Sequence, residues 1–375
     1  MSAPEVAAVI MIGPAGKSVG EQLLARAIRA AATDLIATLS ARGVAPIIVA
    51  GPEPPVVDEE TLYLYDPDRG AFHFGERLAE LVERYRLRAV MYFGAASAPL
   101  LPGEIVEQVR TTLVEAQSAG ARMALTNNLH SSDWVAFTVD EGTVSLLRQV
   151  NRDNSLAWVL QAEGNYRVIC PLAAHPEWAF DLDTPTDLAL VREHHLCPSR
   201  LRLVCQDNLL DRIPVHRLVN ILAQDGSRAA LIGRVAPLAW HTLSQAGQCW
   251  IRVFSEERGM VASERLARGE VQSLVARLID MIGPREFFAE LARLADAAIF
   301  DSRVVMAALG HYPNAGQRFA SDLFLPEAIC DEWLREFTDA ACHAPIPILL
   351  GGHSVVAGGL YVLAGLVFRR RAGDV

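Results

Sequence analysis

The chain has 375 residues, 51% of them hydrophobic, and a formal net charge of −10. This length favours two domains, and the acidic balance argues against a basic surface for nucleic acid or anionic lipid. The N-terminus lacks the basic region of a signal peptide, and the six cysteines show no metal-binding spacing. We therefore expect reduced thiols in a cytoplasmic α/β protein.

The first half of the chain alternates short apolar runs with amphipathic segments. The expected strands are 6–12, 46–50 and 89–93, followed by two more near Met123 and Val135. The expected helices are 21–41, 76–85 and 104–119, and the Pro-rich, acidic stretch 51–70 indicates a loop. This alternation favours a three-layer, mostly parallel sheet of the Rossmann-like kind, with helices on both faces.

A second series of apolar runs begins near Leu201. Its expected strands, with helices between them, are 201–205, 229–233, 249–254, 296–301 and 346–350. We place a boundary within 191–200, which gives one domain over 1–195 and a second α/β domain over 196–375.

The apolar run 346–368 is followed by three arginines, as in many membrane helices. However, two prolines lie at its start, and His353 and Ser354 interrupt it. We therefore expect a buried strand, a glycine loop and a buried helix, and no membrane partner.

The stretch after the first expected strand, VIMIGPAGKSVG, contains Lys17, the only lysine of the chain. A P-loop needs a glycine where this chain has Met11, so its ring of backbone amides would be too small. A glycine-rich turn that leads into a helix can still hold a phosphate, whereas the alternative is an ordinary turn with a solvated lysine. The candidate phosphate contacts are Gly13, Gly16, Lys17, Ser18 and Gly20.

Residues 180–188, FDLDTPTDL, resemble the closing motif of nucleotidyltransferases related to molybdenum cofactor guanylyltransferase and 2-phospholactate guanylyltransferase. The order of elements over 5–192 is similar to that family, and so is GAASAPLL at 94–101. The resemblance implies a nucleotidyltransferase-type fold, a nucleoside triphosphate, Mg²⁺ and a small phosphorylated or carboxylated acceptor. Thr184 and Pro185 would also start a helix without any function attached.

The chain departs from that family where the metal is expected. The strand-end Asp is replaced by the Ala-Ala-Ser-Ala of residues 95–98, so Asp181, Asp183 or Asp133 would have to substitute. Nucleotidyl transfer needs a divalent cation to neutralise phosphate charge. We expect Asp181 and Asp183 to hold Mg²⁺, and Lys17 and Asp183 to act in catalysis. The alternative is a domain that binds a nucleotide or metabolite, or serves as a scaffold, without catalysis.

Polar clusters follow several other expected strands. In TNNLHSSDW, Asn128 and His130 would line a pocket at a strand end or form a surface turn. In GGHSVVAGG, the glycines would let a ligand approach the backbone, and we expect His353 to be a catalytic group rather than a core residue.

The strand ends of the second half would together form an anion site with carboxylates. Its members would be Glu256, Glu257, Arg258, Asp301, Arg303, Arg318, Asp322 and His353. A third interpretation therefore places the active site in the second half, acting on a phosphorylated metabolite. We expect no nucleic-acid partner, and the sequence leaves a homo-oligomer open.

Overall fold

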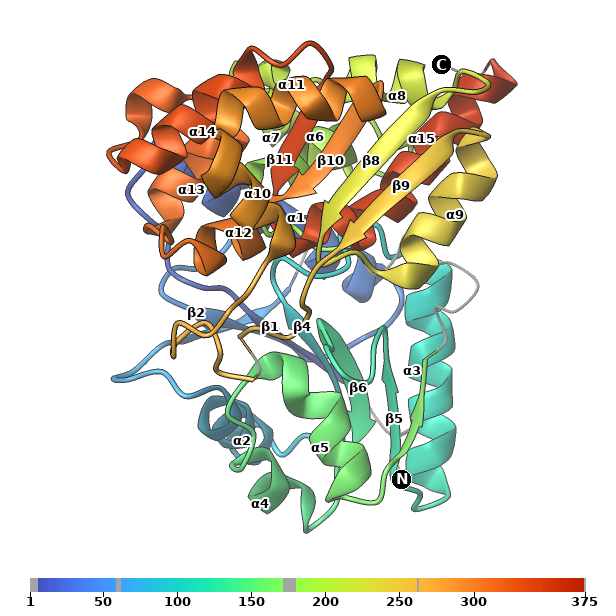
Figure 1. The fold of residues 1–375 in the computed structure, drawn as a ribbon. Helices are drawn as coiled ribbons and strands as arrows, with labels where there is room; N and C mark the ends of the chain where they lie inside the picture. The colour runs from blue at the N-terminus through green and yellow to red at the C-terminus, as the bar shows by residue number, and fades with distance from the viewer. Residues whose placement is uncertain (1–5, 59–61, 171–179, 262, 374–375) are drawn as a thin grey trace. The chain divides into compact units, whose positions relative to one another are not determined.

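The computed structural model describes residues 6–58, 62–170, 180–261 and 263–373 (Figure 1). The chain forms two compact units. Unit 1 consists of Met1–Pro14, Ile28–Asp181 and Pro198–Leu201, and unit 2 of Ala15–Ala27, Leu182–Cys197 and Arg202–Val375. The units thus interleave in sequence, whereas the predicted domains 1–195 and 196–375 are continuous. That division stays a prediction.

Unit 1 is built on a seven-stranded sheet in the order β3-β2-β1-β4-β6-β5-β7. Its strands are β1 (Ala7–Met11), β2 (Ile47–Gly51), β3 (Leu64–Pro67), β4 (Ala89–Gly94), β5 (Met123–Thr126), β6 (Trp134–Thr138) and β7 (Arg167–Ile169). All neighbours pair in parallel except β6, which is antiparallel to both β4 and β5. The predicted mostly parallel sheet is confirmed.

Helices cover both faces of this sheet. They are α1 (Val19–Ala41), whose first part belongs to unit 2, α2 (Phe74–Arg84), α3 (Gly103–Ser118), α4 (Thr143–Leu147) and α5 (Leu156–Ala162). Val9 and Tyr92 lie in one core with α2, α4 and α5. Since successive strand residues face opposite sides, the equally buried Ile10 and Phe93 face the other layer. Helix α3 contacts β4, β5 and β6.

Unit 2 contains a four-stranded, fully parallel sheet in the order β11-β10-β8-β9. Its strands are β8 (Arg228–Gly233), β9 (Trp250–Ser255), β10 (Ala297–Asp301) and β11 (Ile348–Gly351). Its helices are α6 (Pro185–Arg192), α8 (Val215–Leu222), α9 (Pro237–Gly247), α10 (Leu274–Ile282), α11 (Pro284–Leu294), α12 (Ser302–Ala308), α13 (Ala315–Asp322), α14 (Glu332–Cys342) and α15 (Gly358–Ala372). A second α/β unit is thereby confirmed.

Two sequence predictions about elements are wrong. Residues 201–205 do not form a strand but lie largely in helix α7 (Ser199–Val204), because the buried Leu201 and Cys205 follow the i, i+4 spacing of a helix. The expected loop 51–70 contains β3, an edge strand in which only Asp66 is buried, so no apolar run marks it.

The strand and the buried helix predicted within the apolar run 346–368 are confirmed. It forms β11 and most of α15, whose residues Leu360, Val362 and Leu363 are fully buried. No helix in the described ranges has the length and apolar content of a membrane span. Cys197, Cys205 and Cys249 are buried, and Cys170, Cys330 and Cys342 are exposed.

Candidate functional site

A cavity of about 670 Å³ lies at the carboxyl ends of β1, β2 and β4 in unit 1. Its lining consists of Met11, Ile12, Gly13, Pro14, Ala50, Pro52, Asp68, Gly70, Phe72, Phe74, Tyr92, Gly94, Asn151, Arg152 and Asp153. The strand order explains its position. The chain proceeds from β1 outward to β2 and β3, then returns to the other side of β1 as β4. Loops diverge at such a reversal, and ligands of open α/β sheets bind there.

Aromatic side chains form much of the cavity wall. The rings of Phe74 and Tyr92 meet edge-on, with centroids 5.0 Å apart. Burial raises the pKa of Tyr92 well above its usual value, and the nearby Asp153 carboxylate adds to this effect. The hydroxyl of Tyr92 is therefore protonated and donates to Asp153. The lining thus combines an apolar wall with carboxylates of Asp68 and Asp153.

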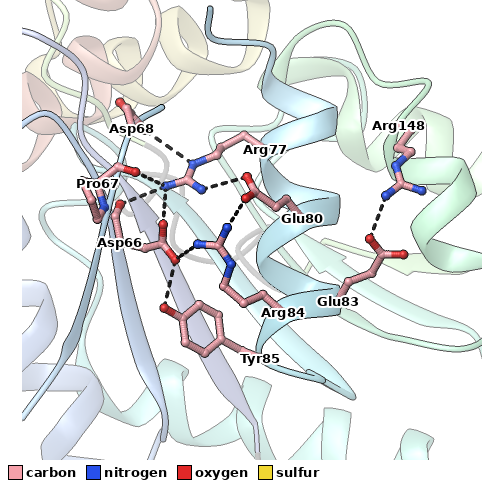
Figure 2. Close-up of polar contacts among 9 residues, drawn as sticks. All are labelled: Asp66, Pro67, Asp68, Arg77, Glu80, Glu83, Arg84, Tyr85 and Arg148. Atoms are coloured by element: carbon pink, nitrogen blue, oxygen red, sulfur yellow. Dashed lines mark hydrogen bonds and ion pairs between the residues drawn. The ribbon is translucent and has the colours of Figure 1, made fainter. Parts of the chain in front are cut away.

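Asp68 is held in place by a guanidinium from α2 (Figure 2). The Nη2 atom of Arg77 donates to the carbonyl oxygen of Asp66 at 2.9 Å and to that of Pro67 at 3.1 Å. Its Nε lies 3.5 Å from the Asp68 carboxylate, and its Nη1 donates to Glu80 at 3.0 Å. One buried side chain therefore fixes the loop that carries Asp68 into the cavity lining.

The centre of this network is the buried carboxylate of Asp66. Burial alone would raise the pKa of Asp66, but hydrogen bonds from Arg77, Arg84 and Tyr85 outweigh that effect and lower it. Figure 2 shows these donors converging on Asp66 from α2 and the residue that follows it. Sequence reasoning missed this network because β3 has no apolar pattern.

Two aspartates meet the turn after β4 through backbone contacts. The Gly94 amide donates to the Asp133 carbonyl at 3.4 Å, and Ser97 forms an antiparallel bridge with Asp181. Asp183, in contrast, belongs to unit 2, where its amide donates to Asp187. Within the described residues, no three His, Cys, Asp or Glu side chains converge to hold a metal. Mg²⁺ binding by Asp181 and Asp183 stays a prediction.

The glycine loop is divided between the two units. Gly13 contributes to the cavity lining of unit 1, whereas residues from Ala15 onward belong to unit 2. Gly20 is buried against Phe319, and a Cβ at this position would lie 2.9 Å from the Cβ of Phe319. Gly20 therefore has a packing role.

An internal carboxylate occupies the amides at the start of α1. The Ser18 amide donates to Oε2 of Glu21 at 3.0 Å, and the Glu21 amide donates to Oγ of Ser18 at 3.2 Å, a reciprocal capping box. Hydrogen bonds to the Glu21 carboxylate from the amide and the side chain of Ser18, and a weaker one from the Lys17 amide, lower the pKa of Glu21. A Cβ on Gly16 would lie 2.3 Å from this carboxyl group. Lys17 itself is exposed, and its phosphate role stays a prediction.

Asn128 and His130 lie in an exposed turn after β5. The His130 amide donates to Oδ1 of Asn128 at 3.0 Å, which is the Asx geometry of a surface turn. Neither residue is among those that line the cavity. Asn128 and His130 thus have the geometry expected of a surface turn.

The DTPTDL motif starts helix α6 in unit 2, as its local pattern predicts. Oδ2 of Asp187 accepts from the amide and hydroxyl of Thr184 at 2.7 and 2.9 Å and from the hydroxyl of Ser354 at 2.8 Å. Oδ1 has no hydrogen-bond partner among the described residues. Burial, and secondarily the nearby Asp183, raise the pKa of Asp187 to about 8.

The predicted convergence of charges at the strand ends of unit 2 is found in part. Asp301, at the end of β10, is fully buried and accepts from Nε and Nη2 of Arg234 at 2.6 and 3.0 Å. Arg303 forms a buried pair with Asp322, with Nη1 and Oδ1 3.0 Å apart. Sequence reasoning missed Arg234, since a lone arginine after a strand carries no pattern.

The two glutamates predicted for this cluster have other partners. Glu256 accepts from the hydroxyl of Ser273 at 2.7 Å at the start of α10. Glu257 pairs with Arg265 at 2.9 Å. Arg318 lies over the ring of Tyr312, 4.6 Å from its centroid, and burial lowers its pKa.

The sequence matches no protein-family model and no curated protein. Solved structures similar to it include three cytidylyltransferases, none of them a guanylyltransferase. A cytidylyltransferase from Leptospira borgpetersenii is 13% identical, over 55% of this chain and 95% of that one, with a TM-score of 0.37. The 4-diphosphocytidyl-2C-methyl-D-erythritol synthase of Anaerococcus prevotii is 10% identical, over 50% and 95%, with a TM-score of 0.32. The 2-C-methyl-D-erythritol 4-phosphate cytidylyltransferase of Thermus thermophilus is 18% identical, over 53% and 98%, with a TM-score of 0.32.

Proposed function

We propose that the cavity of unit 1 binds the nucleoside part of a nucleoside triphosphate. The observation that carries this proposal is the position of the cavity, at the strand reversal between β1 and β4. Its volume lies within the range of small-molecule sites. The apolar wall around Phe74 and Tyr92 suits a base, and the carboxylates of Asp68 and Asp153 suit the hydroxyl groups of a ribose.

We further propose that the bound nucleotide is transferred to a small phosphorylated or carboxylated acceptor. The sequence resemblance to nucleotidyltransferases supports this step. Mg²⁺ is commonly bound by one or two carboxylates together with substrate phosphates. Asp133 and Asp181, whose backbones contact the turn after β4, would supply such carboxylates. The metal would neutralise charge on the α-phosphate and on the departing pyrophosphate.

The second candidate function is nucleotide binding without transfer. It is favoured by the carboxylate of Glu21 on the Ser18 amide, because an anion already occupies part of the predicted phosphate loop.

Calorimetric titration of the full chain with ATP, CTP, GTP and UTP, each with and without Mg²⁺, tests the proposal. We expect one triphosphate to bind, and Gly13→Phe to abolish its binding. Gly13 lines the cavity, and no atom lies within 4 Å of a Cβ placed on it, so the backbone there accepts a side chain. Ala121→Phe, at an exposed position outside the lining, is the control. Failure of every triphosphate to bind would exclude the proposal.

Two further variants separate transfer from binding. Asp181→Asn should reduce pyrophosphate release in the presence of sugar phosphates while the triphosphate still binds. Lys17→Ala should weaken triphosphate binding, and an unchanged Kd would exclude Lys17 from phosphate contact. Binding that is independent of Mg²⁺, with no pyrophosphate release, would leave the second candidate function.

A further inference from the structure

The parallel sheet of unit 2 has its own strand reversal. The chain passes from β8 to β9, then crosses to the other side of β8 as β10 and continues to β11. Arg234 directly follows β8, Asp301 is the last residue of β10, and His353 comes shortly after the end of β11. This is the place where an open α/β sheet binds a ligand, and the nucleotide proposal for unit 1 does not use it.

His353 presents an unused hydrogen-bond acceptor at this edge. One ring nitrogen is hydrogen-bonded to the backbone of Arg234, while Nε2 is buried without a hydrogen-bond partner among the described residues. Burial, and secondarily Arg234, lower the pKa of His353 to about 4, so the ring is neutral near pH 7. The nitrogen that faces the Arg234 carbonyl carries the proton, which leaves a lone pair on Nε2. An unpaired buried acceptor is costly, so this position calls for a donor.

Two guanidinium groups accompany this acceptor. Arg234 uses Nε and Nη2 to hold Asp301, which leaves Nη1 outside that fork, and its side chain is 13% exposed. Arg258, in the exposed loop after β9, is near enough to His353 to lower its pKa. Asp301 is a positioning residue here, because its carboxylate fixes the plane of the Arg234 guanidinium.

We propose that Arg234, Arg258 and His353 form a binding site for a phosphate monoester in unit 2. Phosphate oxygens accept from planar guanidinium groups, and a protonated phosphate oxygen supplies the donor that Nε2 of His353 lacks. A carboxylate or a sulfate offers oxygens to the arginines but no proton to the histidine. The ligand class is therefore a small phosphorylated compound, and recognition depends on its protonated oxygen.

The test is a titration of the full chain with inorganic phosphate and with sulfate, at about pH 6 and equal ionic strength, because phosphate is still protonated there, mostly as H₂PO₄⁻, whereas sulfate carries no proton. We expect phosphate to bind about tenfold more tightly than sulfate, the value of one good hydrogen bond. The ¹⁵N resonance of His353 Nε2 should move with phosphate and not with sulfate. Equal binding of the two anions, or an Nε2 resonance that phosphate does not move, would overturn the proposal.

Variants assign the effect to individual groups. His353→Asn keeps a donor for the Arg234 carbonyl but is too short to replace Nε2, so the preference for phosphate should vanish. His353→Gln, which extends an amide oxygen further, should keep part of it. Arg258→Gln should weaken both anions about tenfold. The controls are His343→Asn and Arg285→Gln, whose side chains are 77% and 78% exposed. A phosphate preference that survives His353→Asn would contradict the proposal.

One further variant separates this site from the cavity of unit 1. Gly13→Phe, which should abolish triphosphate binding, should leave the affinity for inorganic phosphate unchanged. If Gly13→Phe also abolishes phosphate binding, the anion binds in unit 1 and the inference fails while the nucleotide proposal stands.

Discussion

The Nη2 atom of Arg77 donates at 2.9 Å to the carboxylate of Asp66 and, at the same distance, to its backbone carbonyl (Figure 2). The two side chains are only 7% and 3% exposed. The edge strand β3 is therefore joined to α2 by a buried ion pair rather than by apolar packing. This pair also positions the loop that brings Asp68 to the cavity.

We expect Asp66→Asn to lower the free energy of unfolding by about 3–5 kcal/mol, because it removes the buried negative charge that Arg77 and Arg84 share. Urea denaturation measures this loss. Glu83→Gln is the matched control, since Glu83 lies on the same helix and its pair with Arg148 is largely exposed. The control should change stability by less than about 1 kcal/mol. Equal effects of the two variants would contradict a structural role for the Asp66 pair.

Asp187 should make stability fall as the pH rises from about 4 to about 8. An unfolded chain releases this proton near pH 3.8, whereas the folded chain holds it up to about pH 8. The folded state therefore binds the extra proton between these values, and the free energy of unfolding decreases with rising pH until both states are ionised. Asp187→Asn has no such proton, so its stability relative to wild type should improve from about pH 5 to about pH 8.

Urea denaturation at several pH values measures this difference. Asp225→Asn, at an exposed ion pair with Arg371, should run parallel to wild type across the same range. A parallel profile for Asp187→Asn would show instead that the four donors around Oδ2 keep this carboxyl ionised.

Glu21→Ala should destabilise the protein by about 1 kcal/mol, because it removes the carboxylate that accepts from the Ser18 amide in the capping box of α1. Thermal unfolding checks the loss. Glu115→Ala, at an exposed position inside α3, should stay within about 0.5 kcal/mol of wild type. A Glu21 variant as stable as this control would mean that water caps α1 equally well.

Gly233→Ala should cost at least about 2 kcal/mol, since it combines two penalties. Gly233 has a φ of +116°, and its added Cβ would lie 2.5 Å from the Cβ of Asp301. Gly226→Ala shares the positive φ, at +76°, but no atom lies within 4 Å of its Cβ. This control should lose only about 1 kcal/mol, the backbone contribution. Equal losses would show that β8 and β10 can separate freely at Asp301.

The sequence predicts those elements that are buried as apolar runs. Strands β1, β4 and β10 follow from their continuous apolar residues, because a strand covered on both faces leaves that pattern. The pattern carries no direction, so it could not show that β6 is antiparallel. It also could not reveal β3, whose position depends on Asp66 and its ion pairs rather than on apolar residues.

The sites were harder to predict than the strands. Asp68 and Tyr92 belong to separate segments, and only the strand order brings both to one cavity. The composition of the glycine loop predicts a phosphate contact. The amide of Ser18 in this loop instead donates to the carboxylate of Glu21, which no sequence pattern indicates. His353 was identified because a histidine among glycines after a strand is poor core material. Arg234, whose backbone is hydrogen-bonded to His353, follows β8 and lies far from His353 in the sequence.

The division of α1 between the two units has a consequence for how the chain is made. As the ribosome extends the protein, residues 15–27 emerge long before Phe319, against which Gly20 is buried. The start of α1 therefore stays without this packing partner until α13 has been translated. A ribosome-stalled chain ending before α13 should expose this segment to proteolysis, and release of the full-length chain should protect it.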